Sequence, residues 1–486
     1  MIKKYLTTFK NLPPTAKAAL CFTICNLILK GINLLTTPLF TRLLSEYEYG
    51  TLSLFISYEQ CLLLFATWEI ALDAYQKGIF LYKNDVKSFT VTSQLLTNLL
   101  TMIVFIVVFA FKEVVYRFTG MNTEILIFLF IFMLMQPAYS SFLIEKQSQY
   151  KYIPVMIITT VYTVLNVVVP VGSILFFGRT ANIKFSATLV ASISVFIWFY
   201  WGNFKNYWRL RKNIRTVLEQ WKFILCFQLP LLPHKLSYLI LGQADRVMIG
   251  KMVGNREAGI YSTAYTVASI IIIIQGSINQ VLIPWCYRKM DAKAYEEVKK
   301  SANYLLIGMG ALALGTILVA PELMKILFTQ DYYEAIWIIP PVTVGVYFIF
   351  LYSIFSNIET YFAKTTYIMY VSLVCGMLNV VLNYLLMDTF GYIVCGYTTM
   401  VSYVAFAIGH YYFMRKVCKE KINGIYLFDL KKIIGISVGV MIAAFGIMLL
   451  YPYWMIRYGI VFVLAMIAFF KRKMLIEFAK NVLHRK

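Results

Sequence analysis

Residues 205–222 read KNYWRLRKNIRTVLEQWK, and this basic stretch divides a very apolar chain into two parts. Its apolar residues, among them Leu210, Ile214, Val217 and Trp221, recur at helical spacing with Lys and Arg between them. The pattern predicts an amphipathic helix that lies on a membrane face and links two bundles of spans. A solvated basic loop is the alternative interpretation of the same residues.

The parts on either side of this stretch are too apolar for a soluble protein. Of the 486 residues, 60% are hydrophobic and 14% are charged, and the mean hydropathy is +0.70. A soluble protein has about 25% charged residues, whereas a run of about 20 apolar residues is long enough to cross a bilayer. By this criterion the chain has about 14 spans, at 18–40, 49–72, 88–111, 124–143, 153–177, 185–204, 223–244, 258–283, 301–320, 335–355, 366–387, 391–414, 433–451 and 454–470.

These runs predict the fold class and its divisions. We expect an all-α integral membrane protein with about 14 transmembrane helices in two pseudo-symmetric bundles around a central cavity. The expected divisions are an N-terminal bundle at 1–204 with spans 1–6, the cytoplasmic linker at 205–222, a C-terminal bundle at 223–414 with spans 7–12, and two additional spans with a basic cytoplasmic tail at 415–486.

The basic residues orient this map. With the N-terminus in the cytoplasm, most of the 45 Lys and Arg residues fall in the connections that the map places inside. The positive-inside rule then predicts a multi-pass protein of the bacterial inner membrane with both termini cytoplasmic. The formal net charge of +22 lies near anionic lipid headgroups in this arrangement, so we expect no nucleic-acid partner.

A short repeat relates the two halves. The segment FTRLLSEYEYGTLS at 40–53 aligns with IGKMVGNREAGIYS at 249–262 at one constant offset. Arg42 then meets Lys251, and Gly50 meets Gly259. Both segments follow the first span of their half and lead into the second. Internal repeats are a common way to build transporters, because two bundles can rock about a site between them.

Ionisable residues within spans are functional candidates, because each is costly in lipid unless it faces a cavity or a partner. The first span carries Lys30, and the seventh carries His234 and Lys235 shortly after two prolines, followed by Asp245 and Arg246. Under the repeat, Lys30 and Lys235 occupy similar faces of equivalent helices, which predicts a cationic lining for the cavity. We expect the other polar groups of this cavity to be Asn26, Asn33 and Asp245.

Carboxylates cluster in and after the second predicted span. They are Glu59, Glu69 and Asp73, the last at its cytoplasmic end. One interpretation makes them structural partners of Lys30; the other makes them sites that bind H⁺ or Na⁺ for coupling to an ion gradient. Glu59 and Glu69 lie roughly 15 Å apart along a helix, so they cannot share one ion, and Glu59 is the better single candidate.

The sequence indicates a transporter and not an enzyme. It contains no Gly-rich phosphate loop followed by Lys-Ser/Thr, and no nucleophile or zinc motif that would supply catalytic residues. The eight cysteines lie in or beside apolar segments, which favours packing over a metal site or a disulfide framework. We therefore expect no cofactor other than a coupling ion.

The segment KGINLLTTPLFTRLLSEYEYGTLSLFISY at 30–58 resembles the start of the bacterial polysaccharide repeat-unit flippases of the Wzx type, for O-antigen or capsule. These belong to the multidrug/oligosaccharidyl-lipid/polysaccharide exporter superfamily. A second segment, ADRVMIGKMVGNREAGIYSTAYTVA at 244–268, resembles the opening of their second half.

This resemblance implies a substrate and a mechanism. The substrate is an oligosaccharide on undecaprenyl diphosphate, which alternating access of the two bundles moves from the cytoplasmic to the outer leaflet. The implied partners besides membrane lipids are the polysaccharide polymerase and the chain-length regulator. Basic side chains suited to the diphosphate and sugars are Lys30, Arg42, His234, Lys235 and Arg246.

Three rival functions stay open. A multidrug exporter of the same superfamily is expected to have an acidic cavity for cationic drugs, which the embedded Lys30 and Lys235 argue against. A membrane glycosyltransferase or polymerase normally needs a substantial outer loop, whereas the longest outer connections here, near 245–257 and 321–334, are short. A purely structural membrane subunit would leave the charged residues within the spans unexplained.

Overall fold

The protein is all-helical throughout the residues that the computed structural model describes, namely 21, 31–32, 34–205 and 214–470. Residues 34–43 are helical and lead into α3. The helices of the first half are α3 (Glu46–Thr67), α4 (Ala74–Leu81), α5 (Val86–Ala110), α6 (Lys112–Thr119), α7 (Thr123–Ser148), α8 (Tyr152–Phe177), α9 (Ala181–Phe204) and α10 (Ile214–Gln228), with a 3₁₀ turn η1 (Lys83–Asp85).

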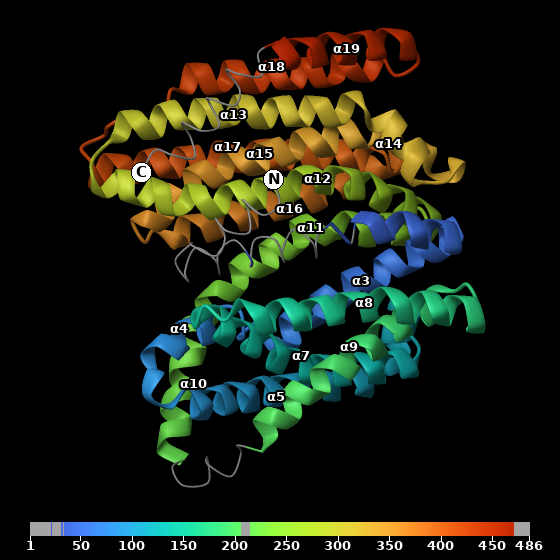
Figure 1. Cartoon of the computed structure of the whole chain (residues 1–486), viewed down its shortest axis with the longest axis vertical. Helices are drawn as coiled ribbons and strands as arrows, with labels where there is room; N and C mark the ends of the chain where they lie inside the picture. The colour runs from blue at the N-terminus through green and yellow to red at the C-terminus, as the bar shows by residue number, and fades with distance from the viewer. Residues whose placement is uncertain (1–20, 22–30, 33, 206–213, 471–486) are drawn as a thin grey trace, which may run out of the picture.

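The second half begins after the 3₁₀ turn η3 (Leu229–Leu231). Its helices are α11 (Leu232–Met252), α12 (Asn255–Asp291), α13 (Tyr295–Leu318), α14 (Ala320–Leu327), α15 (Ile339–Tyr361), α16 (Thr365–Phe390), α17 (Val394–Lys421), α18 (Leu430–Leu449) and α19 (Trp454–Phe470), with a 3₁₀ segment η4 (Gln330–Trp337). Figure 1 shows the two halves as separate layers of long helices that run in roughly the same direction.

Two ends of the molecule can be distinguished, because the long helices alternate in direction. The short helix α4 lies at one end, here called the α4 end, and α6 and α14 lie at the other, the α14 end (Figure 1). The topology predicted from the basic residues places the α4 end in the cytoplasm. In the part of the chain described, 11 helices are long and apolar enough to span a membrane.

Three of the predicted spans are not among these 11 helices. The runs at 391–414 and 454–470 correspond to α17 and α19, which are not among those 11; α19 has only 17 residues. The run at 18–40 falls mostly outside the described residues. The all-helical, two-bundle architecture predicted from the sequence is confirmed.

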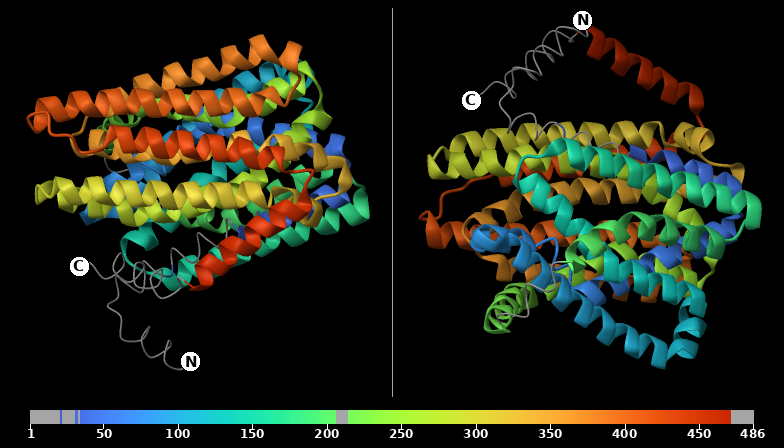
Figure 2. Two further views of the ribbon diagram at one scale, coloured as in Figure 1. Left: turned by 90° about the horizontal axis from the view of Figure 1, so that it is seen from above. Right: turned by 60° about the horizontal axis from the view of Figure 1, so that its bottom comes forward.

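The seventh predicted span, 223–244, differs from what the structure has. The helix α10 already ends at Gln228, a 3₁₀ turn follows, and α11 begins at Leu232. Pro230 and Pro233 explain the break, because proline lacks the N–H that a continuous helix needs. Figures 1 and 2 show α10 running crosswise to the bundle helices at the α4 end, so that residues 214–228 form a connecting helix and α11 alone enters the bundle.

The bundles meet along α3, which packs against α11 and α12 of the other half. At the α14 end, α3 and α12 touch through their backbones: a Cβ atom at Gly50 would lie 1.5 Å from the carbonyl oxygen of Asn255, and one at Gly259 would lie 2.8 Å from that of Glu46. Both contacts obey the constant offset of the sequence repeat. Glycine is therefore required at both aligned positions of this contact between Gly50 and Gly259, here called the glycine seam.

Two cations cross the seam in the same symmetric way. Arg42 donates a hydrogen bond to the carbonyl of Ile326 in α14 at 2.9 Å, and Lys251 donates one to the carbonyl of Phe118 in α6. Each reaches the end of the short helix in the opposite bundle. Arg42 and Lys251 are also aligned by the repeat, so the contacts support two pseudo-symmetric halves joined at the α14 end.

Candidate substrate and coupling site

Lys235 joins the bundles at the α4 end. It lies in the first turn of α11, and its ammonium group contacts the carboxylates of Glu69 and Asp73, the latter at 2.6 Å. Gln228, wholly buried, donates to the carbonyl of Trp68 at 2.6 Å and to Asp73 at 3.1 Å. The cluster of Lys235, Glu69 and Asp73, here called the inter-bundle latch, therefore holds one cation between two carboxylates.

The carboxylates of the latch lie on a turn and not on a helix. The sequence placed Glu69 within the second span, but α3 ends at Thr67, and both Trp68 and Glu69 adopt the left-handed conformation with φ of 51°. Side chains other than glycine are strained there, and such strain persists when surrounding contacts enforce it. Lys235 and Gln228 supply those contacts, and Lys235 is paired with two carboxylates in this structure, whereas the sequence predicted a cationic lining.

Arg246 lies near the bundle interface and makes its hydrogen bonds to neutral acceptors. Its guanidinium group donates to the carbonyl of Gly242 at 2.7 Å, to Gln243 at 3.0 Å and to Ser262 at 3.2 Å, and it lies 4.6 Å from the centre of the Tyr265 ring. Among the described residues, no carboxylate lies within 4.0 Å of it. All of its acceptors are neutral, which leaves its full charge available to an anion.

Gln243 connects Arg246 to the other bundle. It accepts a hydrogen bond from Ser57 at 2.9 Å and donates one to Gln60 at 2.6 Å, both on α3. Arg246 therefore lies one side chain from the interface between α3 and α11, and its partner Ser262 lies within one turn of Gly259.

Asp245, predicted to face the cavity, is placed inside the C-terminal half instead. Its carboxylate is 2% exposed and accepts hydrogen bonds from Tyr261 at 2.5 Å, from Asn383 at 2.6 Å and from Thr399 at 2.6 Å. Asn379 extends the network by donating to Thr399 at 3.1 Å. Oxygen atoms such as these are the ligands that hard cations prefer. All of them come from α11, α12, α16 and α17.

The structure places the other predicted residues separately. Glu59 is half-buried on α3, and the charge that acts on it is the ammonium of Lys184 on α9; among the described residues it has no hydrogen-bond or ion-pair partner. Arg42 is exposed in the α14-end seam, and His234 hydrogen-bonds Ser372 of α16 at 3.1 Å. Lys30, Asn26 and Asn33 lie outside the described residues.

Two ionic contacts were missed from the sequence. Arg457 makes a bidentate pair with Glu322, both bonds at 2.7 Å, which fixes the start of α19 to α14. Glu359 and His410 form a wholly buried pair at 3.0 Å. His410 lies within a predicted span and Glu359 just beyond one, so a search of every span for ionisable groups, instead of the opening helices alone, would have found His410 but not its partner.

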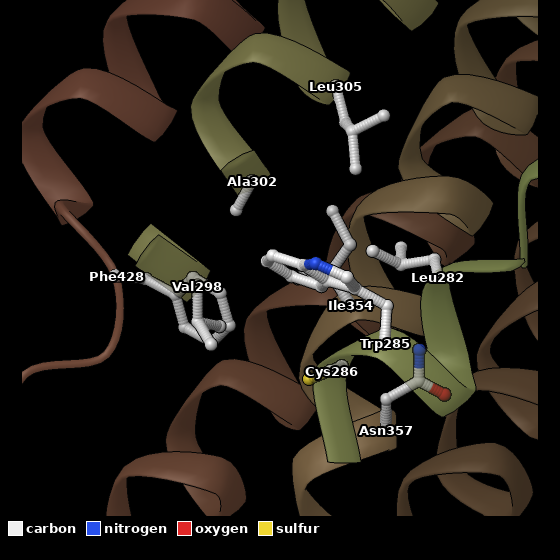
Figure 3. Close-up of a pocket in the computed structure, with 9 residues that line it drawn as sticks. All are labelled: Leu282, Trp285, Cys286, Val298, Ala302, Leu305, Ile354, Asn357 and Phe428. Carbon is white, nitrogen blue, oxygen red and sulfur yellow. The ribbon is translucent and has the colours of Figure 1, made fainter. Parts of the chain in front are cut away.

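The hollows of the C-terminal half do not suit a charged headgroup. The one in Figure 3, lined by Trp285, Cys286 and Ile354 among others, has a volume of about 10 Å³, which is at most the space of one water. A larger groove of about 410 Å³ between α15, α17 and α18 is lined by apolar side chains apart from Ser437 and Tyr411.

Comparison with known families identifies two related sequence patterns. A family model described as "Polysaccharide biosynthesis protein" matches residues 15–290, and one described as "MatE" matches residues 230–385. Among curated proteins, the "Lsg locus putative protein 1" of Haemophilus influenzae is 28% identical over 132 residues, which are 25% of this chain and 32% of that protein. The matched region thus spans about a third of the length of this curated relative.

Solved structures share the fold at low sequence identity. "Lipid II flippase MurJ, inward closed conformation" superposes with a TM-score of 0.65 at 14% identity and covers 94% of this chain and 99% of its own. The "Inward-facing conformation of a multidrug resistance MATE family transporter of the MOP superfamily" has a TM-score of 0.63 at 13% identity and covers 83% of this chain and 100% of its own. At these identities the likeness concerns the two-bundle fold.

Proposed function

Because the chain belongs to the polysaccharide biosynthesis protein family and is a multi-pass membrane transporter of the flippase type, we propose that it moves oligosaccharide repeat units linked to undecaprenyl diphosphate. The movement runs from the cytoplasmic to the outer leaflet of the inner membrane. The choice of an anionic substrate rests on Arg246 at the interface of the bundles. Its charge has no carboxylate partner among the described residues.

The contacts between the bundles support alternating access. At the α14 end they are joined through backbone at Gly50 and Gly259, which leaves no room for a substrate there. At the α4 end the described contacts are side-chain ion pairs on a strained turn, which can open without separating packed backbones. A substrate would enter from the α4 end, and the seam would part to release it at the α14 end.

Arg246 suits a diphosphate better than a neutral or cationic substrate. A guanidinium group presents planar, paired donors that match phosphate oxygens, and its present acceptors, a backbone carbonyl and two neutral side chains, can be exchanged for stronger anionic ones. Tyr265 beneath it keeps the group oriented. The sugars would then lie toward the polar side chains of Gln243, Ser57 and Gln60.

A multidrug exporter is the second candidate, and the match of residues 230–385 to the MatE family model favours it. Such an exporter needs an acidic pocket for cationic drugs. The carboxylates of the latch are neutralised in part by Lys235, and Asp245 is enclosed within its own bundle. The charge that is free at the interface is positive, so the flippase is the better supported function.

Export of the polysaccharide in a host that depends on this protein tests the proposal. Arg246→Ala should abolish surface polymer and cause lipid-linked oligosaccharide to accumulate on the cytoplasmic leaflet, and Arg246→Lys should restore export in part because it keeps the charge but loses the paired donors. Arg179→Ala, at an exposed site, is the matched control. Normal polymer from Arg246→Ala at equal protein levels would overturn the anionic-substrate assignment.

A further inference from the structure

Glu359 of α15 and His410 of α17 form an ion pair that is sealed inside the C-terminal half. Both side chains are 0% exposed, and the Nδ1 atom of His410 lies 3.0 Å from Oε2 of Glu359. Among the described residues, neither the remaining carboxylate oxygen Oε1 nor the remaining ring nitrogen Nε2 has a hydrogen-bond partner. The pair therefore has one empty acceptor and one empty ring position at its edges.

Packing alone does not account for such a pair. The imidazole of His410 stacks on Tyr352 at 5.2 Å and meets the edge of Phe406 at 4.7 Å, so its surroundings are aromatic and supply no charge. A buried ion pair is commonly no more stable than well-packed apolar side chains of the same volume. Ionisable groups within membrane spans are costly, and they mark ion or proton pathways more often than they mark stability.

The pair can change its charge by binding or losing one proton. With one proton on the hydrogen bond between Nδ1 and Oε2, and none on Nε2 or Oε1, the pair has a charge of −1. A second proton, taken from water by Nε2 or Oε1, makes the pair neutral overall, and its return to water restores the charge of −1. Because the surroundings have a low dielectric constant, this change of charge acts strongly on the packing around it.

Other ionisable groups lie near the pair and would respond to this change of charge. His234 on α11 interacts electrostatically with His410, and Lys235 with its two latch carboxylates follows directly along the chain. Toward the α4 end, Lys364 pairs with Glu420 at 3.2 Å and Tyr361 donates to Asp291 of α12. No described ionisable group of α13, α16 or α18 hydrogen-bonds the pair or forms an ion pair with it.

The helix α16 connects the pair to the latch. Val371 packs on Gly409, the residue before His410, where an added Cβ would lie 2.7 Å from the Val371 side chain. The next residue, Ser372, hydrogen-bonds His234, which precedes Lys235. A contiguous path of close contacts thus runs from the buried pair through one turn of α16 to the cluster that holds the bundles together at the α4 end.

We propose that Glu359 and His410 form the proton-binding site of the transport cycle, which takes up a proton in one arrangement of the bundles and releases it in the other. This rests on the proposed transport function and replaces Glu59 as the coupling group. Glu59 has a cation, Lys184, as its electrostatic neighbour and, among the described residues, no hydrogen-bond or ion-pair partner.

Linkage provides a test that requires neither substrate nor transport. A site whose proton affinity depends on the arrangement of the bundles must titrate differently when that arrangement is locked. The chain has three histidines, so ¹⁵N-histidine-labelled protein in lipid nanodiscs gives few signals, and loss of one signal in His410→Gln identifies His410. The lock is a disulfide between Thr51→Cys and Asn255→Cys in a cysteine-free background, because these side chains contact each other across the seam at 2.8 Å.

We expect the proton affinity measured at His410 to differ at least about fivefold between the locked and the reduced protein, the lower bound of ordinary coupling. Glu359→Gln should abolish this difference, whereas Glu59→Gln, the matched control, should preserve it. An identical titration of His410 in the locked and reduced wild-type background would overturn the proposal without relying on any variant of the pair. A state-dependent titration in a protein that does not move lipid-linked oligosaccharide would support the proton site and refute the proposed substrate.

Discussion

The glycine seam at the α14 end allows a sharp perturbation of the bundle arrangement. Alanine at Gly50 would place its Cβ 1.5 Å from the carbonyl oxygen of Asn255 and 3.0 Å from the backbone nitrogen of Gly259. A carbon and a carbonyl oxygen approach to about 3.3 Å without strain. Since backbone atoms cannot rotate away as a side chain can, α3 and α12 must separate by roughly 2 Å at this point.

The clash at Gly50 changes the free-energy difference between the closed and the open arrangement of the α14 end. Forcing an extra methyl group into a packed site costs about 1–3 kcal/mol. That cost falls on the arrangement with the α14 end closed and is absent when the seam is parted, so the closed population should fall roughly 5- to 150-fold relative to the open one. Gly315→Ala in α13 is the matched control, because it adds the same methyl group to a helix where nothing lies within 4 Å.

Spin labels on opposite bundles report the separation directly. Lys112→Cys in α6 and Ile326→Cys in α14 are both exposed at the α14 end. In a cysteine-free background, pulsed electron paramagnetic resonance should show a longer-distance population in Gly50→Ala and the parental distribution in Gly315→Ala. An unchanged distribution in Gly50→Ala would refute the claim that this backbone contact closes the α14 end.

Two further predictions concern the ionic contacts. Lys235→Ala leaves Glu69 and Asp73 without their cation, so we expect a loss of about 1–2 kcal/mol of stability in detergent, reduced by partial exposure, and partial recovery when Glu69→Gln is added. Arg457→Ala should lower the melting temperature through a loss of roughly 2–4 kcal/mol. Burial acts to raise the pKa of Glu322, but its bonds to Arg457 outweigh burial and lower the pKa. The stability that this ion pair contributes should therefore persist above the ordinary glutamate pKa and disappear as acid titration passes the lowered value. Equal acid sensitivity of wild type and Arg457→Ala would contradict this.

The architecture could be predicted because the bilayer imposes it. Apolar runs of span length and the distribution of basic residues follow from the bilayer, so the two helical bundles could be predicted without tertiary information. The repeat was visible at Gly50 and Gly259 for a related reason: the two positions meet across a pseudo-symmetric seam where only glycine fits. Its steric cause, a carbonyl from the opposite bundle, was not visible in the sequence.

Side-chain partners could not be predicted in the same way. Lys235 and Arg246 look equivalent as charges in a span, yet Lys235 contacts two carboxylates, whereas Arg246 has no carboxylate within 4.0 Å in the part of the chain described. The difference arises because α3 ends at Thr67 in a left-handed turn that carries Glu69 back toward α11. Likewise, Glu359 and His410 lie 51 residues apart and meet only through the packing of α15 on α17.

Reconstitution in liposomes measures the proposed movement of lipid-linked oligosaccharide between the leaflets directly. Purified protein in liposomes that carry undecaprenyl-diphosphate-linked oligosaccharide in both leaflets can be probed with an impermeant reagent that reacts with the exposed sugar. We expect wild-type protein to make the inner-leaflet oligosaccharide accessible and Arg246→Ala to leave it inaccessible, while both fold equally well. Equal accessibility with wild-type protein, Arg246→Ala and empty liposomes would contradict it.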